Sequence, residues 1–136
     1  MNTLKLIAAP LAAAAMLVAP SVGAEENTES SAGEIKLAKM LEGRVAGEPQ
    51  SCITVRPNYD LKVIDGTALV YKSGRTLYVN VPDNARSVDD NDTLVRRTSL
   101  SNRVCKMDII TTVDQGSGFY TGNILLGDFI PYRKQS

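Results

Sequence analysis

Two spacings of apolar residues divide the chain. Between Ser31 and Gly43, apolar side chains recur every three or four positions, which is typical of an amphipathic helix. Ser31 stands three residues before Glu34, the spacing of a capping box, so we expect the helix to begin there and to end near Glu42. The apolar stripe expected to pack on the rest of the domain consists of Ile35, Ala38 and Leu41.

Beyond Gln50 the apolar residues alternate with polar ones, which predicts strands. Two turn signals, Asp65-Gly66 and Ser73-Gly74, separate consecutive segments of this kind. The fold class is therefore mainly β: a small antiparallel sheet or barrel of about six to seven strands with one N-terminal helix. We favour the barrel, because closure protects strand edges. The candidate strands are residues 52–55, 61–64, 67–72, 75–81, 93–97, 109–113 and 121–130.

The first 24 residues have the features of a secretory signal peptide. Lys5 precedes an apolar run, and Val22-Gly23-Ala24 supplies the small residues of a cleavage site. Prolines at positions 10 and 20 interrupt the apolar stretch, so no stable membrane anchor is expected after signal removal. We expect a signal peptide over 1–24, a flexible polar leader over 25–33 and a single β-rich domain over 34–136, located in the periplasm or secreted.

Two cysteines, Cys52 and Cys105, are the only pair available, and in an oxidising compartment we expect them to form a disulfide. The bridge would join an early strand to a late one. Their wide separation does not match the Cys-x-x-Cys spacing of a redox-active pair. The closed loop is long enough for the bridge to contribute about 4 kcal/mol to stability through chain entropy.

Composition excludes several kinds of chemistry. The chain contains no histidine, which excludes serine-histidine-aspartate and cysteine-histidine hydrolases. Lys and Arg total 15, as do Asp and Glu, and the only basic runs are Arg96-Arg97 and Arg133-Lys134, so no nucleic-acid partner is expected. Asp89-Asp90-Asn91-Asp92 lacks the glycine and glutamate of a calcium loop and is interpreted as a solvated turn. No catalytic residue, metal site or cofactor is predicted.

Several segments resemble a group of small exported proteins of alphaproteobacteria that has no assigned activity. The resemblance lies in residues 43–47 and 49–53, Ile64-Asp65-Gly66-Thr67, Leu77-Tyr78-Val79-Asn80, Cys105 with Asp108, and Leu126 to Tyr132. Together these pieces extend over most of residues 43–132. The resemblance implies a single exported unit with a disulfide, and it transfers no site residues.

The sequence therefore favours a non-catalytic binding or interaction module in the periplasm, and an envelope protein is one candidate partner. The long irregular segment from Pro82 to Asp92 is where a local function is expected. One alternative is an inhibitor of an exported hydrolase that presents this loop. Another is a carboxylate-dependent hydrolase acting on envelope polymer, which would require two aspartates to converge in a pocket.

Overall fold

The computed structural model describes residues 31–56, 59–97 and 102–135. The expected signal peptide and residues 25–30 of the expected leader lie outside the described residues. The elements, in chain order, are helix α1 (Ala32–Met40), strands β1 (Arg44–Ala46), β2 (Cys52–Thr54), β3 (Asp60–Ile64), β4 (Ala68–Ser73) and β5 (Thr76–Asn80), the short 3-10 helix η1 (Ala85–Ser87), and strands β6 (Asp92–Arg96), β7 (Arg103–Cys105), β8 (Ile109–Asp114), β9 (Tyr120–Leu125) and β10 (Phe129–Lys134).

The strands form three antiparallel sheets, with orders β1-β10-β5-β4-β3, β2-β7 and β6-β8-β9. The mainly β class with one N-terminal helix is confirmed, but the predicted strand number of six to seven is too low. The described residues form ten strands, because the short strands β1 and β7 were not predicted and the segment 121–130 contains two strands. The favoured barrel is wrong, because within the described part of the chain the strands belong to separate sheets and none closes on itself. The segment 121–130 shows why: it was predicted as one strand, but it is divided at residues 126–128 into β9 and β10, which enter different sheets.

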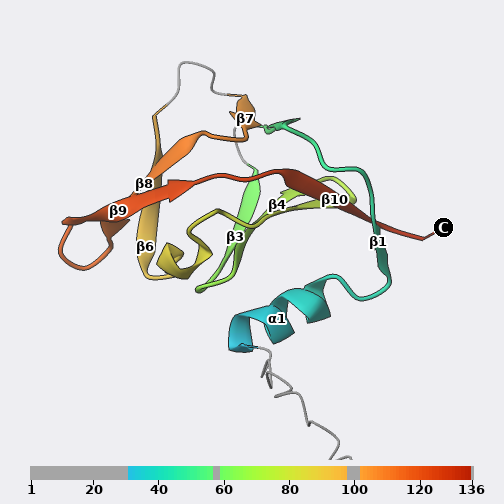
Figure 1. Cartoon of the computed structure of the whole chain (residues 1–136), viewed down its shortest axis with the longest axis horizontal. Helices are drawn as coiled ribbons and strands as arrows, with labels where there is room; N and C mark the ends of the chain where they lie inside the picture. The colour runs from blue at the N-terminus through green and yellow to red at the C-terminus, as the bar shows by residue number, and fades with distance from the viewer. Residues whose placement is uncertain (1–30, 57–58, 98–101, 136) are drawn as a thin grey trace, which may run out of the picture.

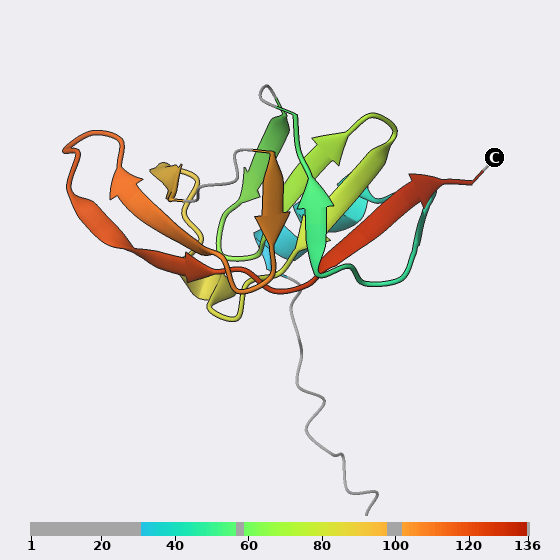
Figure 2. The same cartoon turned by 90° about the horizontal axis from the view of Figure 1, so that it is seen from above.

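The five-stranded sheet is the central layer, and both of its faces are covered (Figures 1 and 2). Helix α1 packs on one face, over a core that includes Ile64, Val70 and Val79. The other face lies under the β2-β7 sheet, and its core extends into the three-stranded sheet through Ile110 and Ile124. Alternate side chains of β4 and β5 therefore enter two different cores.

Helix α1 begins with the predicted capping box. The Glu34 backbone N–H donates to Ser31 Oγ at 3.2 Å, and the Ser31 N–H donates to Glu34 Oε2 at 2.9 Å. The predicted buried stripe is wrong in part: Leu41 packs on the sheet together with Leu37 and Met40, whereas Ile35 is 51% exposed and Ala38 is also exposed.

The residues of α1 that pack on the sheet are partly buried, and a close approach at Gly33 explains why they differ from the predicted stripe. A Cβ atom at this position would overlap the Thr67 side chain and lie 2.8 Å from the Asp65 carbonyl oxygen. The glycine side of the helix therefore faces the sheet, and the residues four, seven and eight positions later follow it there. Since α1 starts at Ala32, the last two residues of the expected leader belong to this helix.

The disulfide between Cys52 and Cys105 is present and joins β2 to β7 as expected. The two cysteines face each other directly in the antiparallel register, and the adjacent pair Ile53 and Val104 is buried. The bridge therefore holds together a two-stranded sheet that covers the larger core.

Candidate functional site

One end of the five-stranded sheet carries a cleft of about 620 Å³ whose lining is strongly basic. We call it the basic cleft and define it by Arg44, Lys72, Arg75, Arg133 and Lys134. The remaining lining residues are Gly74, Thr76 and Gln135, so the described residues that line the cleft include no carboxylate. Five cations thus meet in one hollow of a chain whose formal net charge is zero.

The strand register assembles this cleft from three distant parts of the chain. Arg44 of β1 lies directly opposite Lys134 of β10, and Arg133 lies opposite Thr76 of β5. The tight turn of the β4-β5 hairpin, where Gly74 has φ 58°, adds Lys72 and Arg75. The five basic residues therefore line one cleft because β1 begins, and the β4-β5 hairpin turns, beside the last residues of β10.

Backbone carbonyl groups hold Arg44 in place. Its Nη1 donates to the Arg75 carbonyl oxygen at 2.9 Å and to the Tyr132 carbonyl oxygen at 3.3 Å. Arg133 Nε donates to Thr76 Oγ1 at 3.3 Å. The ion pair found among the described residues, between Lys106 and Asp128, lies outside the cleft. Neutral groups therefore orient two of the five cations of the basic cleft, Arg44 and Arg133.

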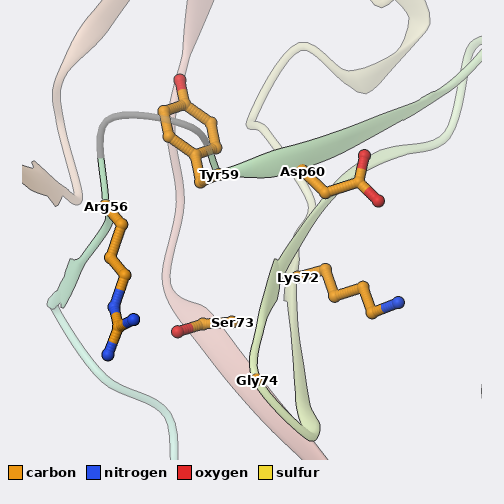
Figure 3. A pocket seen from close by; sticks show the side chains of 6 residues that line it. All are labelled: Arg56, Tyr59, Asp60, Lys72, Ser73 and Gly74. Carbon is orange, nitrogen blue, oxygen red and sulfur yellow. The ribbon is translucent and has the colours of Figure 1, made fainter.

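Two further hollows adjoin the cleft and extend its basic character. The one drawn in Figure 3, of about 430 Å³, shares Lys72 and Gly74 with the cleft and adds Arg56 and Asp60. Asp60 and Lys72 are paired in the β3-β4 register, and their side chains extend to the same side in Figure 3. A hollow of about 290 Å³ beside α1 shares Arg44 and Lys72 and adds Lys62. Across the three hollows, Asp60 is the only carboxylate among the described lining residues.

The opposite end of the sheet is acidic. Carboxylate oxygens of Asp65, Asp89 and Asp90 lie within 4.8 Å of one another and form the acidic cluster. Asp92, from the same predicted turn, is instead buried and accepts a hydrogen bond from the Thr121 hydroxyl at 2.7 Å. The Asp89 Oδ1 already accepts from the Asn91 N–H at 2.8 Å, and the segment 89–92 lacks the glycine and glutamate of a calcium loop. We assign no metal to the cluster.

The loop from Pro82 to Asp92 is bound to the body of the protein. Val88, in its middle, is 1% exposed and belongs to the larger core. The Asn84 side chain pairs with the β9 backbone, donating to the Asn123 carbonyl at 2.7 Å and accepting from the Leu125 N–H at 3.1 Å. The loop therefore does not project freely from the surface.

Perturbed acid-base groups lie away from the basic cleft. Burial raises the pKa of the Tyr71 phenol well above its usual range, and the nearby Tyr59 adds to this effect. The hydroxyl and backbone N–H of Ser117 bind Asp114 Oδ1 and lower the pKa of that carboxyl. Burial explains the first pKa shift and local hydrogen bonds explain the second. Neither Tyr71 nor Asp114 lines the basic cleft.

Comparison of the chain with family models, curated proteins and solved structures finds no match. In the part of the chain that the structure describes, no helix has the length and apolar character needed to cross a bilayer.

Proposed function

We propose that the mature protein is a non-catalytic binding module that acts in the periplasm or after secretion and holds an anionic ligand in the basic cleft. The observation that carries this proposal is that five basic residues, and no carboxylate, are found among the described residues that line one cleft. The chain has as many acidic as basic residues, so the two kinds of charge could have been mixed evenly over the surface. The fold instead separates a basic end from the acidic cluster, which creates a local field that attracts anions.

The Cys52–Cys105 disulfide supports the location, because disulfides persist in oxidising compartments outside the cytoplasm. The resemblance to small exported proteins points the same way. An acidic segment of an envelope protein and a phosphate-bearing molecule would both supply the anionic groups that the cleft requires.

Two observations rank the alternatives. The convergence of Asp65 with Asp89 favours a carboxylate-dependent hydrolase, since paired carboxylates can divide the acid and base roles. These carboxylates line a hollow of about 330 Å³ together with Asp92, but Asp89 is engaged by a local backbone N–H. An inhibitor role for the 82–92 loop has less support, because Val88 and Asn84 fix that loop to the domain.

Binding of labelled polyanions to the disulfide-intact mature chain tests the proposal. We would measure fluorescence anisotropy with a polyglutamate and a polyphosphate chain at increasing salt. Affinity should fall as salt rises, since each ion pair formed releases counterions, and the slope of log affinity against log salt should be about one per contact. Binding of either probe fits the proposal.

A pair of charge-matched variants locates the binding. Arg44→Gln with Lys134→Gln removes two charges from the basic cleft, whereas Lys36→Gln with Arg86→Gln removes two exposed charges elsewhere. The first variant should lose most of the affinity and the second should keep it. Failure of both probes to bind at low salt, or equal losses in the two variants, would reject the proposal.

A further inference from the structure

Arg44 is preorganised as a ligand-binding group. Its Nη1 is occupied by two backbone carbonyls, so the guanidinium is held in one orientation while Nη2 and Nε remain to donate to a ligand. Holding the planar fork in advance lowers the entropy cost of binding an oxyanion. This arrangement goes beyond a general positive field, because it selects for the geometry of the bound group.

The same residue takes part in an unfavourable pair. Arg44 and Lys134 lie directly opposite each other on neighbouring antiparallel strands, where like charges are destabilising. Arg133, one position before Lys134, also lines the cleft and is paired with the uncharged Val45. Local choices that lower stability are expected at functional sites. An anion bound between these side chains would remove the repulsion. In the free protein the repulsion between Arg44 and Lys134 is therefore uncompensated.

We infer that the anionic groups held in the basic cleft are phosphates; this rests on the function proposed above. The basic residues come from three segments of the chain: Arg44 from β1, Lys72 and Arg75 from the β4-β5 hairpin, and Arg133 and Lys134 from β10. A carboxylate is planar, and one guanidinium fork satisfies both of its oxygens. A phosphate presents several oxygens in a tetrahedral arrangement and higher charge, so it can accept from donors of more than one segment at once.

Calorimetric titration of the mature chain with pyrophosphate and with citrate tests this inference. Both small anions carry similar charge near neutral pH but differ in the geometry of their oxygens. Pyrophosphate should bind about tenfold more tightly than citrate, a difference of ~1.4 kcal/mol. Equal affinity, or tighter binding of citrate, would overturn the inference while leaving polyanion binding through the cleft intact. The two proposals therefore fail separately.

Arg44→Lys is the informative variant, because it keeps the charge and removes the fork. We expect it to retain salt-dependent binding of polyglutamate but to lose the preference for pyrophosphate. Retention of that preference would contradict the role of Arg44. In addition, Lys134→Gln should raise the melting temperature of the free protein and reduce the further rise produced by pyrophosphate, a combination that a purely structural lysine would not give.

Two sources of phosphate are separated by flotation with vesicles of phosphatidylcholine, with and without phosphatidylglycerol. Flotation only with the anionic vesicles, reversed by pyrophosphate, would identify lipid headgroups as the phosphate source. Pyrophosphate binding without flotation would identify a soluble phosphate-bearing ligand. Flotation that pyrophosphate does not reverse would contradict phosphate recognition in the cleft.

Discussion

The Asn80 side chain fixes the point at which the chain passes from the three-stranded sheet into the five-stranded sheet. It is fully buried, its Nδ2 donates to the Gly127 carbonyl oxygen at 2.8 Å, and its Oδ1 accepts from the Gly127 N–H at 3.0 Å. Gly127 lies between β9 and β10, and a Cβ atom there would lie 2.7 Å from the Val81 carbonyl oxygen. Asn80→Ala would therefore leave both backbone groups of a buried, tightly packed residue without these partners.

The expected loss of stability follows from those two groups. An unsatisfied buried donor or acceptor costs about 1–3 kcal/mol, so leaving two such groups in Asn80→Ala should lower the free energy of unfolding by about 2–6 kcal/mol. For a domain of this size the melting temperature should fall by roughly 10–30 °C. Urea denaturation of the disulfide-intact protein measures the change. Asn123→Ala, at an exposed asparagine that also bonds to neighbouring side chains, is the control and should change stability by less than about 0.5 kcal/mol.

Asn80→Asp provides a second, independent check. An ionised aspartate keeps an acceptor for the Gly127 N–H but faces the Gly127 carbonyl oxygen with a charge and no donor. A protonated aspartate can donate again, so the destabilisation relative to the unmodified protein should become smaller as the solution is acidified. A loss below about 1 kcal/mol in Asn80→Ala, or a pH-independent loss in Asn80→Asp, would refute the reasoning.

Three further predictions concern the bridge and the perturbed acid-base groups. Replacing Cys52 and Cys105 together by alanine should lower the free energy of unfolding by about 4 kcal/mol in urea denaturation, and an unchanged midpoint would contradict this. The raised pKa of Tyr71 leaves stability unaffected at neutral pH, but stability should fall once the pH exceeds the ordinary tyrosine range, because the unfolded chain then releases the proton first. Alkaline unfolding curves of Tyr71→Phe should lack that component. Ser117→Ala should raise the pKa of Asp114 towards its usual value, because it removes the hydroxyl that donates one of the two Ser117 hydrogen bonds to the Asp114 carboxylate. A carboxyl NMR titration measures this pKa, and an unchanged value would refute the prediction.

Local signals in the sequence predicted local structure well. The Ser31–Glu34 spacing identified the helix start, and Ser73-Gly74 identified the β4-β5 turn. The residues of α1 that pack on the sheet could not be predicted in full. They depend on the close approach of Gly33 to Thr67, which helical periodicity does not reveal. The barrel prediction failed for a related reason. The segment predicted as one strand divides at Gly127 into β9 and β10 of different sheets, and Gly127 is held there by the distant, buried side chain of Asn80.

The basic cleft was not predictable from basic runs. Arg44 and Lys134 lie ninety positions apart in sequence and become neighbours only through the β1-β10 register. Arg133-Lys134 was the one local signal, and alone it is too short to indicate a binding site. The expectation that nucleic acid is not a partner depended on the same absence of long runs, so it stays a prediction, which titration with a single-stranded oligonucleotide checks.

The most direct test of anion binding in the basic cleft is an NMR titration of the isotope-labelled, disulfide-intact protein with pyrophosphate. Backbone amide shifts should concentrate at Arg44, at the β4-β5 turn around Arg75, and at Arg133 and Lys134. These shifts should saturate together and weaken as salt is added. Shifts centred instead on Asp65 and Asp89, or the absence of saturable shifts at low salt, would contradict the claim that this protein binds anions through its basic cleft.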